Sequence, residues 1–96
     1  MPEVTVTLRD KTISVSANRV QASVKAGHKV RWTSTDGPFQ VAFKPESDWT
    51  NPPAATEQNG VWSTECGPFD KDGVVLSYAV RATGYKTLDP EIEIIP

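Results

Sequence analysis

Hydrophobic and polar residues alternate along most of the chain with a period of two. From Glu3 to Arg9, for instance, Val4, Val6 and Leu8 are separated by polar residues. This pattern is typical of a half-buried β-strand, because successive side chains of a strand point to opposite faces of the sheet. The alternation recurs and predicts about seven short strands, near residues 3–9, 13–16, 20–24, 30–34, 39–43, 74–80 and 92–94.

Turn signals such as Gly27-His28 and Asp36-Gly37-Pro38 separate these segments. Short strands with frequent turns predict an all-β fold, an antiparallel Greek-key β-sandwich, and 96 residues suit a single domain over residues 1–96. An immunoglobulin-like sandwich is the nearest alternative, although its cysteine pair is missing because the chain has one cysteine. Apolar runs are too short to cross a bilayer, so no membrane contact is expected.

The alternation fails over residues 44–72, which contain four prolines and two of the three tryptophans. A segment of this length without periodicity is unusual in a small domain, and such segments are either functional or carry short structure of their own. We expect one short strand near Val61–Ser63 and a helical turn near 53–58.

The amino-acid composition bears on the cellular compartment and on association with other chains. The single cysteine, Cys66, excludes an internal disulfide and suits a reducing compartment. The residues from Met1 onward show no signal-peptide pattern, so a cytoplasmic location is expected unless the protein leaves by another route. Residues 1–44 carry seven Lys or Arg against three Asp or Glu, whereas residues 45–96 carry three against nine. This split, together with the free edges of an open sandwich, predicts weak homo-oligomers.

Candidate catalytic and nucleic-acid-binding groups are few. His28 is the only imidazole, and no serine lies in a Gly-x-Ser-x-Gly motif. Cys66 lies close to Glu65 and Asp70, whose charges oppose thiolate formation. The basic residues around 25–31 belong to a chain that is acidic overall, so nucleic-acid binding is not expected. No catalytic residue is assigned.

The pieces Lys25-Ala26-Gly27-His28-Lys29-Val30-x-Trp32, Phe39-Gln40-Val41 and Leu88-Asp89-Pro90-Glu91-Ile92 occur in an order that resembles the cupredoxin family of plastocyanin-like and azurin-like blue-copper proteins. The resemblance implies copper ligands at Gln40, at Ala79 or Val80, and at Thr83. None of these side chains is an imidazole or thiolate, which copper prefers. The resemblance therefore implies the fold without the metal, and no cofactor is expected.

The remaining candidates are aromatic. Irregular segments should gather at the end where the family binds copper, and their large side chains either plug the core there or form an exposed contact surface. The predicted binding residues are Phe39, Gln40, Trp49, Trp62, Phe69 and Tyr85. We predict a non-enzymatic binding or structural module that contacts an unidentified protein or glycan. A carbohydrate-binding module that uses the loop aromatics, and a small enzyme that uses the acidic 44–72 segment, remain alternatives.

Overall fold

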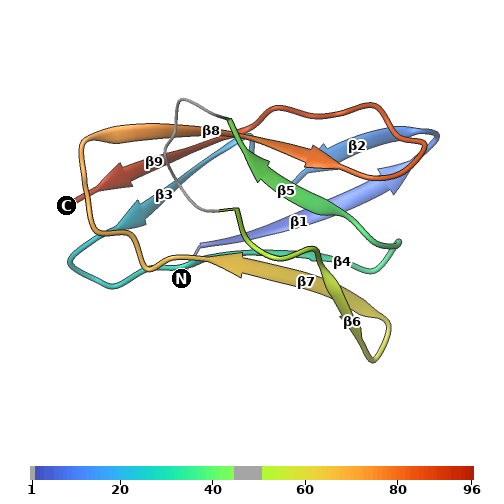
Figure 1. The fold of residues 1–96 in the computed structure, drawn as a ribbon, viewed down its shortest axis with the longest axis horizontal. Coiled ribbons are helices and arrows are strands. Elements are labelled where there is room, and N and C mark those ends of the chain that lie inside the picture. The colour runs from blue at the N-terminus through green and yellow to red at the C-terminus, as the bar shows by residue number, and fades with distance from the viewer. Residues whose placement is uncertain (1, 45–50) are drawn as a thin grey trace.

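A computed structural model describes residues 2–44 and 51–96. Its described residues contain nine strands and no helix (Figure 1). The strands are β1 (Glu3–Arg9), β2 (Thr12–Val15), β3 (Arg19–Ser23), β4 (Val30–Ser34), β5 (Gln40–Phe43), β6 (Thr56–Gln58), β7 (Val61–Cys66), β8 (Val74–Arg81) and β9 (Glu91–Ile95). The all-β prediction is confirmed. The described part contains no helix that is long and apolar enough to span a membrane.

The strands form one sheet of five, in the order β2-β1-β4-β7-β6, and one of four, in the order β3-β9-β8-β5. Both sheets are mixed, since β1 pairs with β4 in parallel and so does β3 with β9. The prediction of purely antiparallel sheets is therefore wrong. Side-chain alternation reveals which face of a strand is buried, but it says nothing about the direction of the neighbouring strand.

The segment 44–72 also differs from its prediction. Thr56–Gln58 is a strand and not a helical turn, and β7 extends past the predicted 61–63 to Cys66. The two strands form a hairpin across Asn59-Gly60, both of which have positive φ angles of 54° and 81°. A two-residue turn of this conformation is the one that matches the twist of a hairpin, and asparagine followed by glycine favours it.

One hydrophobic core lies between the sheets and takes residues from both. At its centre, Trp32 of β4 and Tyr78 of β8 have no exposed surface, and their rings contact edge to face at 5.3 Å between centroids. Trp32 Nε1 donates a hydrogen bond of 3.1 Å to the Tyr78 hydroxyl, so a polar contact joins the two layers inside the core. Buried aromatic N–H and O–H groups need such partners.

The loops and turns divide between two ends of the molecule (Figure 1). At the end that we call the pocket end, the backbone N–H of Lys86 bonds to Lys11 O, and the N–H of Leu8 bonds to the Asp36 carboxylate. The first contact joins the β1–β2 turn to the β8–β9 loop, and the second joins β1 to the β4–β5 connection. The opposite end contains the turn before β4 and the loop between β7 and β8.

Candidate functional site

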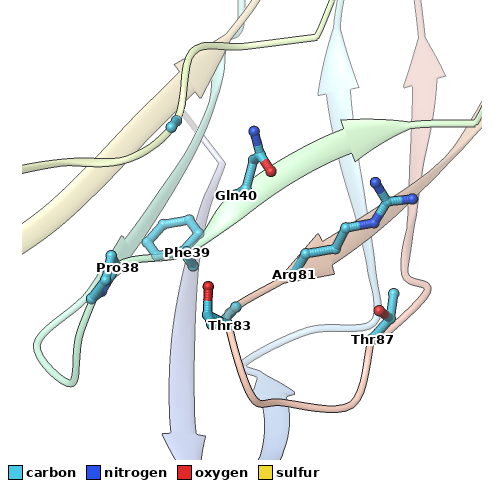
Figure 2. Close-up of a pocket in the computed structure, with 8 residues that line it drawn as sticks. Pro38, Phe39, Gln40, Arg81, Thr83 and Thr87 are labelled. Atoms are coloured by element: carbon cyan, nitrogen blue, oxygen red, sulfur yellow. The ribbon is translucent and has the colours of Figure 1, made fainter.

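A cavity of about 490 Å³ opens at the pocket end. Three separate segments supply its lining: the end of the β4–β5 connection with the start of β5, the chain just before β6, and the end of β8 with the β8–β9 loop (Figure 2). The lining residues are Pro38, Phe39, Gln40, Ala54, Arg81, Ala82, Thr83 and Thr87.

The first wall is set by the turn after β4. Asp36 accepts a hydrogen bond of 2.9 Å from the Leu8 N–H, and its own N–H donates to Ser34 Oγ over 3.1 Å. The chain then returns as β5. Phe39, just before this strand, and Val41 within it both belong to the core and are 3% and 1% exposed. Because side chains alternate along the strand, Gln40 faces outwards and is exposed at the cavity.

The second wall is the loop between β8 and β9. Val80 and Leu88 exchange two backbone hydrogen bonds of 2.8 and 3.2 Å, which close the neck of the loop. Arg81 and Thr87 are the residues just inside this neck, and the Tyr85 N–H bonds to Ala82 O to form the turn beyond. The loop therefore leaves and re-enters the sheet at fixed points on either side of the cavity.

The third wall is residues 51–55, which contact both sheets. Asn51 Oδ1 accepts a hydrogen bond of 2.6 Å from the Phe43 N–H, and the Ala55 N–H donates to Phe39 O, so this segment caps the outer edge of β5. The Thr64 hydroxyl of β7 donates to Pro53 O over 2.7 Å. Ala54 lies between these attachments, exposed on the cavity.

Arg81 is the charged residue of the lining. It is the Cα partner of Gln40, and cross-strand partners share a face of the sheet, as Figure 2 shows for their side chains. Arg81 is exposed and forms no ion pair with residues 2–44 or 51–96. The other polar lining groups, the Gln40 amide and the hydroxyls of Thr83 and Thr87, are neutral. Within the described residues, the cavity thus combines one cation without an ion-pair partner with neutral hydrogen-bonding groups and apolar surface.

The predicted site residues do not all gather there. Phe39 and Gln40 line the cavity, but Phe39 is almost wholly buried. Tyr85 belongs to the β8–β9 loop and is half-buried. Trp62 is half-buried on β7, opposite Ser34 near the end of β4. Trp49 lies outside the described residues.

The prediction that Phe69 lies at the pocket end is wrong. Its segment follows Cys66, which pairs with Val30 at the beginning of β4, and Gly67 contacts the backbone of His28 at the opposite end. Phe69 itself is 4% exposed and belongs to the core. The loss of alternation in 44–72 hid the path of the chain, which runs along β7 from one end to the other.

The lining residues that were named neither as binding residues nor as ligand positions are Pro38, Ala54, Arg81, Ala82 and Thr87. Arg81 is the last residue of a well-predicted strand, two positions before Thr83, where the cupredoxin resemblance implies a ligand. That proximity was the available signal. Ala54 carries none, because only the fold brings residues 51–55 against β5.

The residues that carry other chemistry lie elsewhere. His28 is at the opposite end, where its Nδ1 accepts a hydrogen bond of 3.1 Å from the Ser23 N–H. Cys66 is buried. No group of three or more His, Cys, Asp or Glu in the described ranges is arranged to hold a metal ion. Burial raises the pKa of Tyr78, and the hydrogen bond from Trp32 offsets this rise in part, but Tyr78 lies in the core.

A second, smaller hollow of about 260 Å³ lies beside β7. Ala54 lines both hollows, and Arg31 and Glu65, which are Cα partners on β4 and β7, provide charges of opposite sign. Glu65 also pairs with Lys29 at 3.5 Å. The lining of this hollow therefore contains charges of both signs, unlike the described lining of the cavity at the pocket end.

In comparisons with known proteins, no family model and no curated protein matches this chain.

Proposed function

We propose that this chain is a non-enzymatic binding module with a copper-free, cupredoxin-like Greek-key fold. Two features support the finer description of the fold. Strands distant in sequence pair with each other, as β1 with β4 and β3 with β9, which requires crossing connections. In addition, Gln40 and Thr83, two positions where the resemblance implies copper ligands, line the same cavity.

The cavity at the pocket end is the observation that carries the binding proposal. Small-ligand sites are concave and combine apolar surface with a few convergent polar groups, and this cavity is concave and contains both kinds of surface in about equal parts. Three segments, each attached by backbone hydrogen bonds, hold its walls in place. A site that exists before its ligand arrives avoids part of the entropy cost of binding.

The lining also supports the non-enzymatic part of the proposal. General acid–base chemistry needs groups that exchange protons near neutral pH, and arginine, amide and threonine side chains do not. They are equally poor copper ligands in comparison with imidazole and thiolate. What these groups do well is donate and accept hydrogen bonds, which serves recognition.

Saturation-transfer NMR with a set of small fragments of varied charge tests the proposal. Ala54→Trp fills the cavity from an exposed position, and Ala26→Trp adds the same side chain at an exposed position in the turn before β4, at the opposite end. We expect fragments to bind the unmodified chain and Ala26→Trp but not Ala54→Trp. Equal binding to all three proteins, or binding to none, would refute the proposal, and conversion of a fragment over time would indicate an enzyme.

A carbohydrate-binding module remains the second candidate, because Trp62, a residue of the β6–β7 hairpin, is half-exposed. Stacking of a sugar on this indole would shift or quench its emission. A panel of soluble glycans that leaves tryptophan emission unchanged would remove this candidate.

A further inference from the structure

We propose that the ligand of this cavity carries a single carboxylate beside a compact apolar group, and that Arg81 binds the carboxylate. The inference rests on the proposed function and names its ligand class. It begins from the charge of the lining, in which Arg81 is the one ionised side chain among the eight residues. The guanidinium of Arg81 is a cation, so the cavity presents a positive charge.

The geometry of the guanidinium favours a planar anion. Its N–H donors form a fork that matches the two oxygens of a carboxylate. The neutral partners nearby, Gln40 on the facing strand and Thr87 across the loop neck, donate further hydrogen bonds without adding charge. A phosphate group, with up to two negative charges at neutral pH, would keep one charge unmatched by Arg81, the one cation of the described lining. The lining therefore favours a monoanion.

The remaining lining residues define what accompanies the carboxylate. Pro38, the edge of Phe39, Ala54 and Ala82 supply apolar surface. If the ligand carries an apolar group next to its carboxylate, that group covers these side chains and removes their apolar surface from water, which favours binding. Two sources offer this chemistry: a free aromatic or aliphatic acid, and the C-terminal carboxylate of a peptide that ends in an apolar residue.

Matched probes test the proposal. Benzoate and benzamide have nearly the same shape and differ in charge, so we would titrate each into the isotope-labelled chain and follow amide shifts by NMR. The variants are Arg81→Gln and, as control, Arg31→Gln, which removes an exposed arginine from the other sheet. We expect benzoate to bind the unmodified chain and Arg31→Gln with a Kd on the order of millimolar. Binding of benzamide, and of benzoate to Arg81→Gln, should be at least about tenfold weaker.

A second pair of probes separates the two sources. Acetyl-Ala-Phe with a free carboxylate and its C-terminal amide present the same peptide with and without the charge. Tighter binding of the acid peptide than of benzoate supports a peptide terminus, and weaker binding supports a free acid. Benzoate binding no tighter than benzamide, or unchanged by Arg81→Gln, overturns the inference. The proposed function survives that result if neutral fragments still bind the unmodified chain and fail to bind Ala54→Trp.

Discussion

The hydrogen bond between Trp32 and Tyr78 offers a sharp test of how the two sheets are joined. Tyr78→Phe removes one oxygen atom from the centre of the core and keeps the ring, so the edge-to-face contacts of residue 78 with Trp32 and Phe43 remain. The substitution removes the Tyr78 hydroxyl, the acceptor 3.1 Å from Trp32 Nε1, and this donor is fully shielded from water.

The expected cost follows from that unpaired donor. A buried donor that loses its partner costs about 1–3 kcal/mol, from which the relief of no longer burying the phenol hydroxyl is subtracted. We therefore expect Tyr78→Phe to lower the free energy of unfolding by about 1–2 kcal/mol. A domain of this size has a total stability of roughly 5–14 kcal/mol, and the melting temperature should fall by about 5–15 °C.

Urea unfolding, followed by tryptophan fluorescence and circular dichroism, measures this change. Tyr85→Phe is the matched control, because it deletes the same atom from a half-buried residue of the β8–β9 loop, and its cost should stay below about 0.5 kcal/mol. The slope of the transition should be the same for all three proteins, since the surface exposed on unfolding does not change. If Tyr78→Phe unfolds at the same urea concentration as Tyr85→Phe, the cross-sheet hydrogen bond does not stabilise the fold as argued.

Four further predictions address pH, backbone strain, copper and association. Burial raises the pKa of Tyr78 above its unfolded value of 10.0, so the contribution of the neutral hydroxyl to the free energy of unfolding is complete below pH 10 and is lost as the pH rises further. The loss of stability of Tyr78→Phe at alkaline pH should therefore be smaller than that of the unmodified chain. Gly67→Ala should cost about 1–3 kcal/mol, because φ is 117° and a Cβ atom would lie 3.1 Å from both His28 O and Lys29 Cα, whereas Gly84→Ala, with positive φ and open space, should cost less. Equal melting temperatures of these two variants would exclude the clash. Titration with Cu(II) should give no intense thiolate charge-transfer band, and a blue colour would contradict the copper-free proposal. Light scattering at high protein concentration and low salt should detect weak self-association, and a strict monomer would count against it.

The sequence predicted the strands that bury one face in the core between the two sheets, because such burial leaves an alternating pattern of hydrophobic and polar residues. The range 3–9 coincides with β1, and Val30, Trp32 and Ser34 are the buried residues of β4. It failed for β6, whose three residues are all exposed and so show no alternation. The Asn59-Gly60 pair, which favours a two-residue hairpin turn, is the signal for this hairpin that the sequence does contain.

The candidate site could be predicted only in part, because contacts between segments distant in sequence leave no local pattern. Gln40 was identified by position within the cupredoxin resemblance, and it lines the cavity. Ala54 joins the same lining through hydrogen bonds that its neighbours make with β5 and β7, partners that no local pattern specifies. Phe69 was misplaced because an aperiodic segment does not reveal which end of the molecule it reaches.

The central claim is that this chain binds its ligand in the cavity at the pocket end. The most direct measurement maps the amide shifts that a bound fragment causes across the assigned spectrum of the chain. We expect the largest shifts at Gln40, Ala54, Ala82 and Thr83, around the cavity that these residues line. Largest shifts around His28 and Gly67, at the opposite end of the molecule, would contradict it.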